Sequence, residues 1–166
     1  MQKEKINTFL VEVFNTILQL EDRALSSSHE FSNLSVNEFH VIEAVIACGE
    51  NSSMSAVSRR LGITVGSLTV AVKTLTAKGY LRREKRINDM RMVYVVPTER
   101  GIAANEYHSA FHHKMVDAVM AKLPEEELDT LVSALEIVAG FFADTRESRG
   151  APSQEAQPGQ PTSLTL

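Results

Sequence analysis

The sequence predicts a mostly helical fold that contains one small β-hairpin. Apolar residues recur at helical spacing in six segments, and residues suited to helix caps precede several of them. Short runs typical of strands occur between residues 80 and 96. The chain of 166 residues is 43% hydrophobic and 23% charged, a composition that allows a buried core.

The first two helices have clear signatures. Residues 6–25 have an apolar stripe at the spacing of an amphipathic helix, formed by Ile6, Phe9, Leu10, Val13, Phe14, Ile17 and Leu18. The second helix begins after Ser35, because Ser35 and Glu38 have the spacing of a capping box. Leu34 and Phe39 occupy the positions of a hydrophobic staple, which fixes the path of the chain into this helix.

A short third helix is predicted from Ser53 to Gly62, followed by a fourth that Thr64 caps and Gly79 ends. A short helix, a turn with glycine and a second helix are typical of a helix-turn-helix. The fourth helix buries an apolar face of Leu68, Ala71, Val72 and Leu75. Its other face is small and largely uncharged, although propensity favours Ala, Leu, Glu or Lys on an exposed face.

A basic hairpin follows directly. The runs "YLRREKR" and "RMVYVV" are predicted strands, and "INDM" at residues 87–90 is the predicted turn. A fifth helix begins after Thr98 and a sixth near Pro124, whose fixed backbone suits a first turn. Residues 147–166 are rich in Pro, Gly, Ser and Gln, which predicts a disordered tail.

Charge is distributed unevenly along the chain. The net charge is −4, but residues 58–91 contain nine basic and two acidic residues, a net of +7. The rest of the chain contains eight basic and nineteen acidic residues, a net of −11. A basic patch on an acidic body is typical of a nucleic-acid-binding surface, and a solvated charged hairpin is the alternative.

The helix-turn-helix and hairpin together predict a winged helix-turn-helix whose fourth helix enters the major groove of double-stranded DNA. A small outward face permits close approach to base edges, whereas the alternative is a buried helix whose small residues allow tight packing. We expect Arg91 to enter the minor groove and Asp89 to brace the turn of the wing. The other predicted DNA-binding residues are Thr64, Ser67, Thr69, Val70, Lys73 and Arg82.

Residues 54–101 resemble the MarR family of winged helix-turn-helix regulators. The shared features are "LGIT" before the fourth helix, L-x-x-K-G-Y-L after it, D-x-R at the wing and T-x-x-G at the fifth helix; Pro97 departs from the usual leucine. The resemblance implies an interlocked homodimer on a pseudo-palindromic operator. Its parts would be a dimerisation helix in residues 1–34, a DNA-binding lobe in 35–98 and dimerisation helices in 99–146, before the tail of 147–166.

A narrower resemblance, in "GITVGSLTVAVKTLTAKGYL" and "FHHKMVDAVM", is to MarR-type repressors of fatty acid biosynthesis genes in Gram-positive bacteria. It implies that a long-chain acyl chain on acyl carrier protein acts as corepressor and lies in an apolar pocket. Taken singly, each residue expected to line this pocket is more often ordinary core. The expected pocket residues are Phe14, Ile17, Leu18, Phe39, His40, Ile42, Phe111 and Met115.

The histidines support an alternative, a zinc-responsive regulator. His108 and His112 share a helical face, His40 lies on the second helix, and Glu21 or Glu106 could add an oxygen ligand. The prediction of a fatty acid repressor, in contrast, needs no metal and no cofactor other than the acyl-ACP corepressor. A redox switch at Cys48 is disfavoured, because a helix C-terminus does not lower the pKa of a thiol.

The sequence does not predict an enzyme, since it contains no nucleophile elbow, phosphate loop or HExxH motif. Its charged N-terminus is neither a signal peptide nor a membrane span. With Cys48 as its only cysteine, we expect a cytoplasmic protein with no membrane partner.

Overall fold

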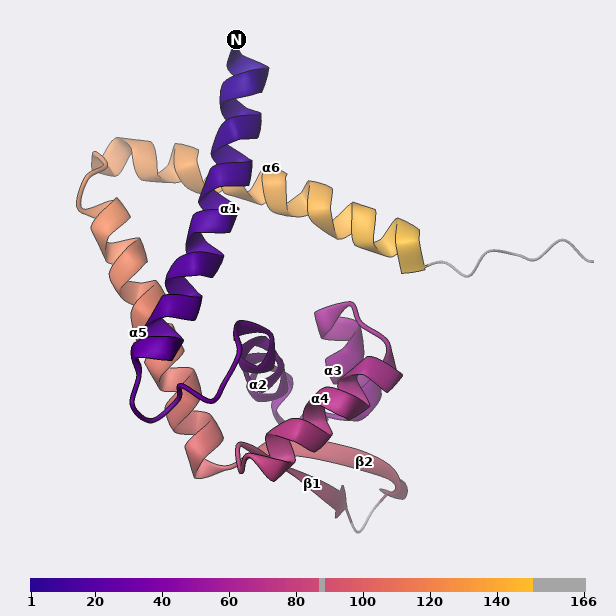
Figure 1. Ribbon diagram of the computed structural model, residues 1–166. Coiled ribbons are helices and arrows are strands. Elements are labelled where there is room, and N and C mark those ends of the chain that lie inside the picture. The colour runs from indigo at the N-terminus through magenta and orange to yellow at the C-terminus, as the bar shows by residue number, and fades with distance from the viewer. Residues whose placement is uncertain (87–88, 151–166) are drawn as a thin grey trace, which may run out of the picture. The chain divides into compact units, whose positions relative to one another are not determined.

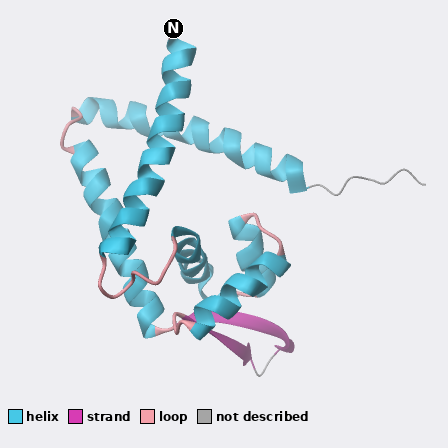
Figure 2. Ribbon diagram, in the orientation of Figure 1, coloured by secondary structure: helices cyan, strands magenta, loops and turns pink. Residues whose placement is uncertain are grey.

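The computed structural model describes the backbone of residues 1–86 and 89–150, and the side chains of 1–86 and 92–143. It forms two compact units, residues 1–122 and 123–166. The first unit contains α1 (Gln2–Ser27), α2 (Val36–Cys48), the 3-10 turn η1 (Gly49–Asn51), α3 (Met54–Leu61), α4 (Val65–Ala77), β1 (Leu81–Arg86), β2 (Asp89–Pro97) and α5 (Glu99–Met120) (Figures 1 and 2). The second unit contains α6 (Glu125–Gly150).

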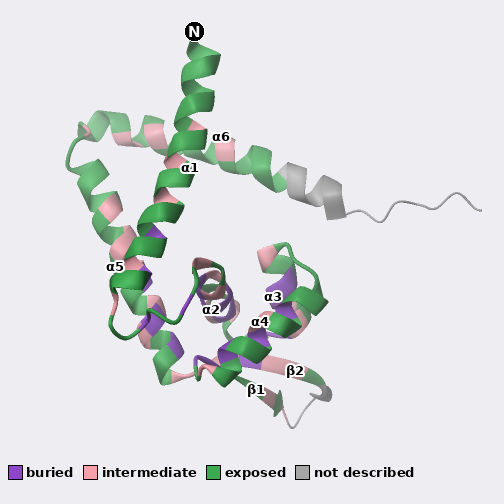
Figure 3. Cartoon of the chain, in the orientation of Figure 1, coloured by how far each residue is buried: buried purple, intermediate pink, exposed green. Residues whose placement is uncertain are grey.

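The central helix of the first unit is α2, which packs against α1, α3, α4, α5 and β2. Phe39, Ile42 and Val45 on α2 are fully buried, and Figure 3 shows buried residues along this helix. Helices on several sides leave α2 little solvent exposure, so its buried positions extend beyond one amphipathic stripe.

The expected helix caps are present. Ser35 and Glu38 form the reciprocal capping box, with the Ser35 N–H donating to the Glu38 carboxylate at 2.9 Å. Ser53 and Thr64 cap α3 and α4 by accepting backbone N–H groups at 3.2 and 3.1 Å. Gly62 separates these two helices with φ of +68°, a left-handed conformation that glycine adopts without steric cost. These contacts set the helix-turn-helix geometry.

The wing is an antiparallel hairpin with Leu81 opposite Pro97 and an irregularity between Glu84 and Arg86. The predicted turn of residues 87–90 is wrong in extent, because Asp89 already pairs with Arg86. Residues 87 and 88, the remainder of that turn, lie outside the described part of the chain. On the opposite edge of β2, the Val95 N–H donates to the Ser52 carbonyl at 2.9 Å and anchors the wing near the start of α3.

The two long N- and C-terminal helices extend beyond their predicted bounds. α1 starts at Gln2 and ends at Ser27, whereas the apolar stripe predicted only residues 6–25. α6 continues to Gly150, past residue 147 where the tail was expected, and 151–166 lie outside the described residues. α5 belongs to the first compact unit and α6 to the second, and the assignment of residues 99–146 to dimerisation stays a prediction.

Much of the apolar surface of α1 and α6 remains accessible to solvent. Phe9 and Phe14 on α1 are 59% and 50% exposed, and Leu135 on α6 is 54% exposed. Among the described residues, no helix combines the length and apolar character needed to cross a membrane. Exposed apolar faces of this kind are typical of surfaces that contact another protein.

Candidate DNA-binding interface

α4 has one buried and one exposed face, as the sequence predicts. Leu68, Val72 and Leu75 are fully buried in the core, whereas Val70 is 68% exposed. The alternative of a fully buried helix is therefore excluded. The other predicted contact residues of this helix region are also exposed, and they are Thr64, Ser67, Thr69 and Lys73.

The hydroxyl groups on this face are partly occupied by local hydrogen bonds. Thr69 Oγ1 donates to the Val65 carbonyl at 2.7 Å, and the Thr64 and Ser67 hydroxyl oxygens lie 2.9 Å apart. Such bonding to the preceding turn is a common alternative for threonine in helices. The Thr69 hydroxyl oxygen keeps its lone pairs as acceptors, and donation to DNA would require its proton to turn away from the Val65 carbonyl.

The basic side chains of the wing have neighbours of their own. Arg82 pairs with Glu84 at 2.8 Å, and the Arg86 guanidinium lies 4.0 Å from the centre of the Tyr94 ring. Arg83 Nη2 donates to the Thr69 carbonyl at 3.4 Å, which connects β1 to α4. This contact places the basic wing directly beside α4.

The two residues predicted to act at the tip of the wing are Asp89 and Arg91. The backbones of Asp89 and Arg91 belong to β2, and their side chains lie outside the described ones. The bracing role of Asp89 and the minor-groove role of Arg91 stay predictions.

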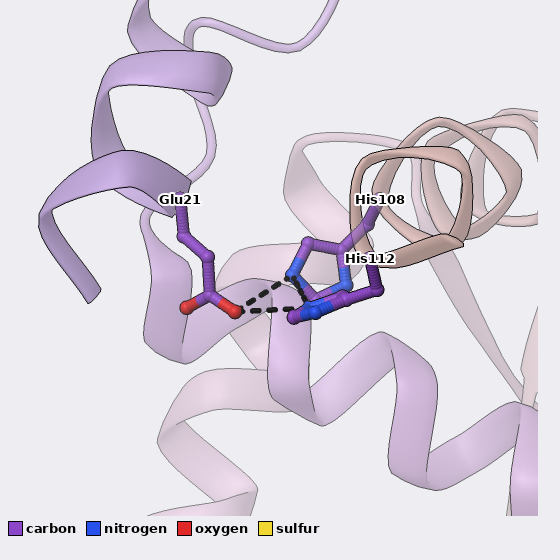
Figure 4. A group of neighbouring side chains, drawn as sticks. All are labelled: Glu21, His108 and His112. Atoms are coloured by element: carbon purple, nitrogen blue, oxygen red, sulfur yellow. Dashed lines mark hydrogen bonds and ion pairs between the residues drawn. The ribbon is translucent and has the colours of Figure 1, made fainter. Parts of the chain in front are cut away.

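A second cluster of polar groups joins α1 to α5. Glu21 Oε1 lies 2.9 Å from His112 Nε2 and 3.4 Å from His108 Nε2, and the two imidazole nitrogens are 3.1 Å apart (Figure 4). His40 Nε2 on α2 is 4.0 Å from the other carboxylate oxygen of Glu21. Glu106, the other expected oxygen ligand, is not part of the Glu21–His108–His112 cluster.

This cluster lies in a poorly solvated environment. Glu21 is 3% exposed, and its Oε2 atom is buried with no hydrogen-bond partner among the residues that the structure describes. Burial lowers the pKa of His108, the neighbouring His112 lowers it further, and the charge of Glu21 opposes both. His108 is therefore favoured in its neutral form, which leaves a nitrogen lone pair available for a ligand.

The residues expected to line an apolar pocket are spread over different environments. Phe39 and Ile42 are fully buried in the core, Phe14 and Leu18 are about half exposed, and Phe111 is intermediate. Met115 and Ile17 are also intermediate. The Phe39 ring contacts His108 with centroids 4.5 Å apart. Phe39 and Ile42 therefore act as core residues in this structure.

A polar junction at the end of α4 was not predicted. Arg100 donates to the Lys78 carbonyl at 3.0 Å and its guanidinium lies 4.4 Å from the centre of the Tyr80 ring. In the sequence, the pattern K-G-Y indicates only that the helix ends there. The residues from distant segments that contact it, such as Asn33, could not be inferred from local spacing.

A helix-turn-helix of α3 and α4 followed by an antiparallel wing places this chain in the class of winged helix-turn-helix proteins. The model of the MarR family matches residues 32–92. The crystal structure of Streptococcus pneumoniae FabT in complex with DNA is similar, with 31% identity, a TM-score of 0.80 and coverage of 86% of this chain and 99% of that chain. The protein belongs to the MarR family, which is a family of transcriptional regulators and not of enzymes.

Two further proteins are similar. The HTH-type transcriptional regulator SarZ of Staphylococcus haemolyticus is 29% identical over 106 residues, 64% of this chain and 70% of that protein. The S. aureus MepR–DNA complex has a TM-score of 0.66 at 16% identity, over 81% of this chain and 94% of that chain, which supports the fold.

Proposed function

We propose that this protein is a sequence-specific repressor that binds double-stranded DNA through α4 and the wing. The observation that most strongly supports it is the exposed, small face of α4 beside a basic hairpin, with Val70 68% exposed. The similar FabT structure is a complex with DNA. In this proposal the major-groove residues are Thr64, Ser67, Thr69, Val70 and Lys73, while Arg82 contacts phosphate, Arg91 enters the minor groove and Asp89 braces the turn.

The DNA-binding form is proposed to be a homodimer. Phe9, Phe14 and Leu18 leave an apolar stripe on α1 about half exposed, and Leu135 and Phe142 do the same on α6. Exposed apolar surface of this kind on a soluble protein is typical of an interface. Residues 1–34 and 99–146 would then supply dimerisation, and 35–98 would supply one DNA half-site contact per protomer.

The proposed DNA binding can be tested by selecting duplexes from a randomised library and measuring affinity by fluorescence anisotropy. We expect a pseudo-palindromic consensus and a strong fall in affinity with salt, because phosphate contacts release counterions. A protein that recovers no consensus and binds every duplex equally would contradict sequence-specific recognition.

The regulated genes are proposed to be those of fatty acid biosynthesis, with long-chain acyl-ACP as corepressor. The likeness to FabT over 99% of that chain supports this assignment. The acyl chain would need the region around Phe14, Leu18, Phe111 and Met115 to open beside the core. A duplex from upstream of fatty acid synthesis genes should bind more tightly with long-chain acyl-ACP than with the unacylated carrier, and equal affinity would exclude the corepressor.

A divalent metal is the second candidate effector, favoured by the cluster of Glu21, His108 and His112. Ligand atoms on a tetrahedral zinc ion are roughly 3.3 Å apart, given bonds of about 2.0–2.1 Å. The observed separations of 2.9, 3.1 and 3.4 Å are close to that spacing. Glu21 Oε2 is buried and accepts no hydrogen bond from the described residues, and His40 Nε2, 4.0 Å from it, is the candidate for a fourth ligand.

Zinc binding can be measured by calorimetry and its effect on DNA affinity by anisotropy. His112→Ala should abolish tight zinc uptake, whereas His113→Ala, which changes the exposed neighbouring histidine outside the cluster, should not. Equal zinc affinity for both variants would place the metal elsewhere. A response to acyl-ACP with no response to zinc would make the histidines structural partners of Glu21.

A further inference from the structure

We propose that residues 78–80, at the end of α4, form a junction that sets the position of the DNA-reading helix. Lys78 and Arg100 act there as positioning residues, and neither contacts DNA. This inference rests on the proposed DNA-binding function. Lys78 and Arg100 lie beside the basic wing, but in this inference they position α4 and do not contact phosphates.

Lys78 has no ammonium proton left for a phosphate. Its Nζ atom lies 2.8 Å from both carboxylate oxygens of Glu38 on α2, and it also donates to the backbone carbonyl of Asn33 in the loop that precedes α2. An ammonium group has three donors, and all three have acceptors here. The Glu38 carboxylate is 16% exposed and also accepts the Ser35 N–H, so this pair is well ordered.

Two more side chains join the same loop to the same segment. The Tyr80 hydroxyl donates to Asn33 Oδ1 at 2.7 Å, and the Tyr80 side chain is fully buried. Arg100 on α5 donates to the Lys78 carbonyl at 3.0 Å and to the Glu30 carbonyl at 3.3 Å. Lys78, Tyr80 and Arg100 therefore tie the end of α4 to the loop between α1 and α2.

The first turn of α5 holds the segment from another direction. Thr98 Oγ1 donates to the Gly79 carbonyl at 2.7 Å, and the Thr98 N–H donates to the Tyr80 carbonyl at 3.0 Å. Residues 78–80 thus have partners both in the loop that follows α1 and at the start of α5. Movement of either helix is transmitted to the end of α4.

Small changes at the junction have large effects at the other end of α4. A helix of 13 residues is about 20 Å long, so a tilt of about 5° moves its far end by about 1.7 Å. That displacement exceeds the tolerance of a hydrogen bond to a base edge. Residues far from the DNA can therefore control affinity through α4.

The experiment compares Lys78→Gln, Glu38→Gln and the double variant on a duplex selected by the wild-type protein. Glutamine suits the third helical position of a capping box, so α2 keeps its start in Glu38→Gln. Glu43→Gln is the matched control, because it removes an exposed carboxylate from the same helix. Affinity is measured over a salt series, and amide hydrogen exchange of residues 78–80 is measured in the free protein.

The sign of the Glu38→Gln effect separates positioning from net charge. Removing a carboxylate strengthens DNA binding if only charge matters, as expected for Glu43→Gln. Positioning predicts that Glu38→Gln and Lys78→Gln each weaken binding by about tenfold, the size of one lost charge-assisted hydrogen bond. We expect the double variant to be no weaker than either single variant, with an unchanged salt slope and faster exchange at 78–80.

Three outcomes overturn the proposal. One is a Lys78→Gln variant whose salt slope falls by about 0.9, because that is the signature of a lost phosphate contact. Another is Glu38→Gln binding as tightly as Glu43→Gln, and the third is unchanged exchange at residues 78–80. Failure of the wild-type protein to select any duplex would instead overturn the proposed function, while the exchange data still decide whether the junction holds α4.

Discussion

Replacing Gly101 by alanine tests how closely α5 approaches the end of α4. A Cβ atom at residue 101 would lie 2.2 Å from the Tyr80 carbonyl oxygen and 3.5 Å from Pro97 Cβ. Carbon and oxygen atoms without a bond between them require more than 3 Å, so the two backbones would separate by about 1 Å. The Tyr80 oxygen accepts the Thr98 N–H, and that separation would also break the start of α5.

The expected cost follows from these contacts. Overpacking typically costs about 1–3 kcal/mol, and loss of a helix cap costs about 1 kcal/mol. The intrinsic gain of alanine over glycine in a helix, about 1 kcal/mol, offsets part of this. We expect Gly101→Ala to lower the free energy of unfolding by about 1–3 kcal/mol.

Gly66→Ala is the matched control for this prediction. A Cβ atom there would meet only Thr64 Oγ1 at 3.7 Å, an ordinary contact, so the variant should gain up to about 1 kcal/mol. Urea unfolding monitored by circular dichroism at one protein concentration measures both variants. A Gly101→Ala protein as stable as the wild type would refute the close approach of residues 80 and 101.

Three further predictions address the core, the junction and the interface. Phe39→Ala should lower the free energy of unfolding by about 3–5 kcal/mol in urea titrations, because its side chain is fully buried, while Val70→Ala should change it little. Burial raises the pKa of Glu38, but hydrogen bonds from Lys78 and Ser35 and the Lys78 charge lower it below 4.5 overall. As pH falls, Glu38 is therefore protonated in the unfolded chain before it is protonated in the folded chain. The stability that the Glu38 carboxylate contributes above pH 4.5 is lost as pH falls through its folded pKa, and Glu38→Gln should not show this loss in acid titrations. Arg82→Gln should reduce the salt slope of DNA binding by about 0.9, and an unchanged slope would exclude a phosphate contact there.

Local sequence signals predicted the elements well because they depend on nearby residues. Ser35, Ser53, Thr64 and Thr98 cap helices where their spacing indicated. Such contacts span three residues and need no knowledge of the fold. The extent of the wing turn was wrong because pairing of Arg86 with Asp89 depends on the whole ladder rather than on turn propensity.

Contacts between distant segments were harder to infer. Sequence spacing placed His108 and His112 on one face and suggested Glu21 as one of two acidic partners. Only the packing of α1 against α5 selects Glu21, which lies 87 positions before His108 in the chain and 3.4 Å from it in space. The junction of Lys78 with Asn33 and Glu38 has the same origin, since each pair depends on how α2 docks.

The distribution of charge illustrates both the use and the limit of counting residues. Nine cations in residues 58–91 predict a DNA-binding surface, and if all met phosphates the salt slope per protomer would be about −8. Lys78 is instead held by Glu38, and Arg86 is stacked on Tyr94. Because these groups already have partners, forming the complex releases fewer ions. We therefore expect a measured slope per protomer clearly shallower than −8, and a slope that steep would mean that the internal contacts exchange for phosphates on binding.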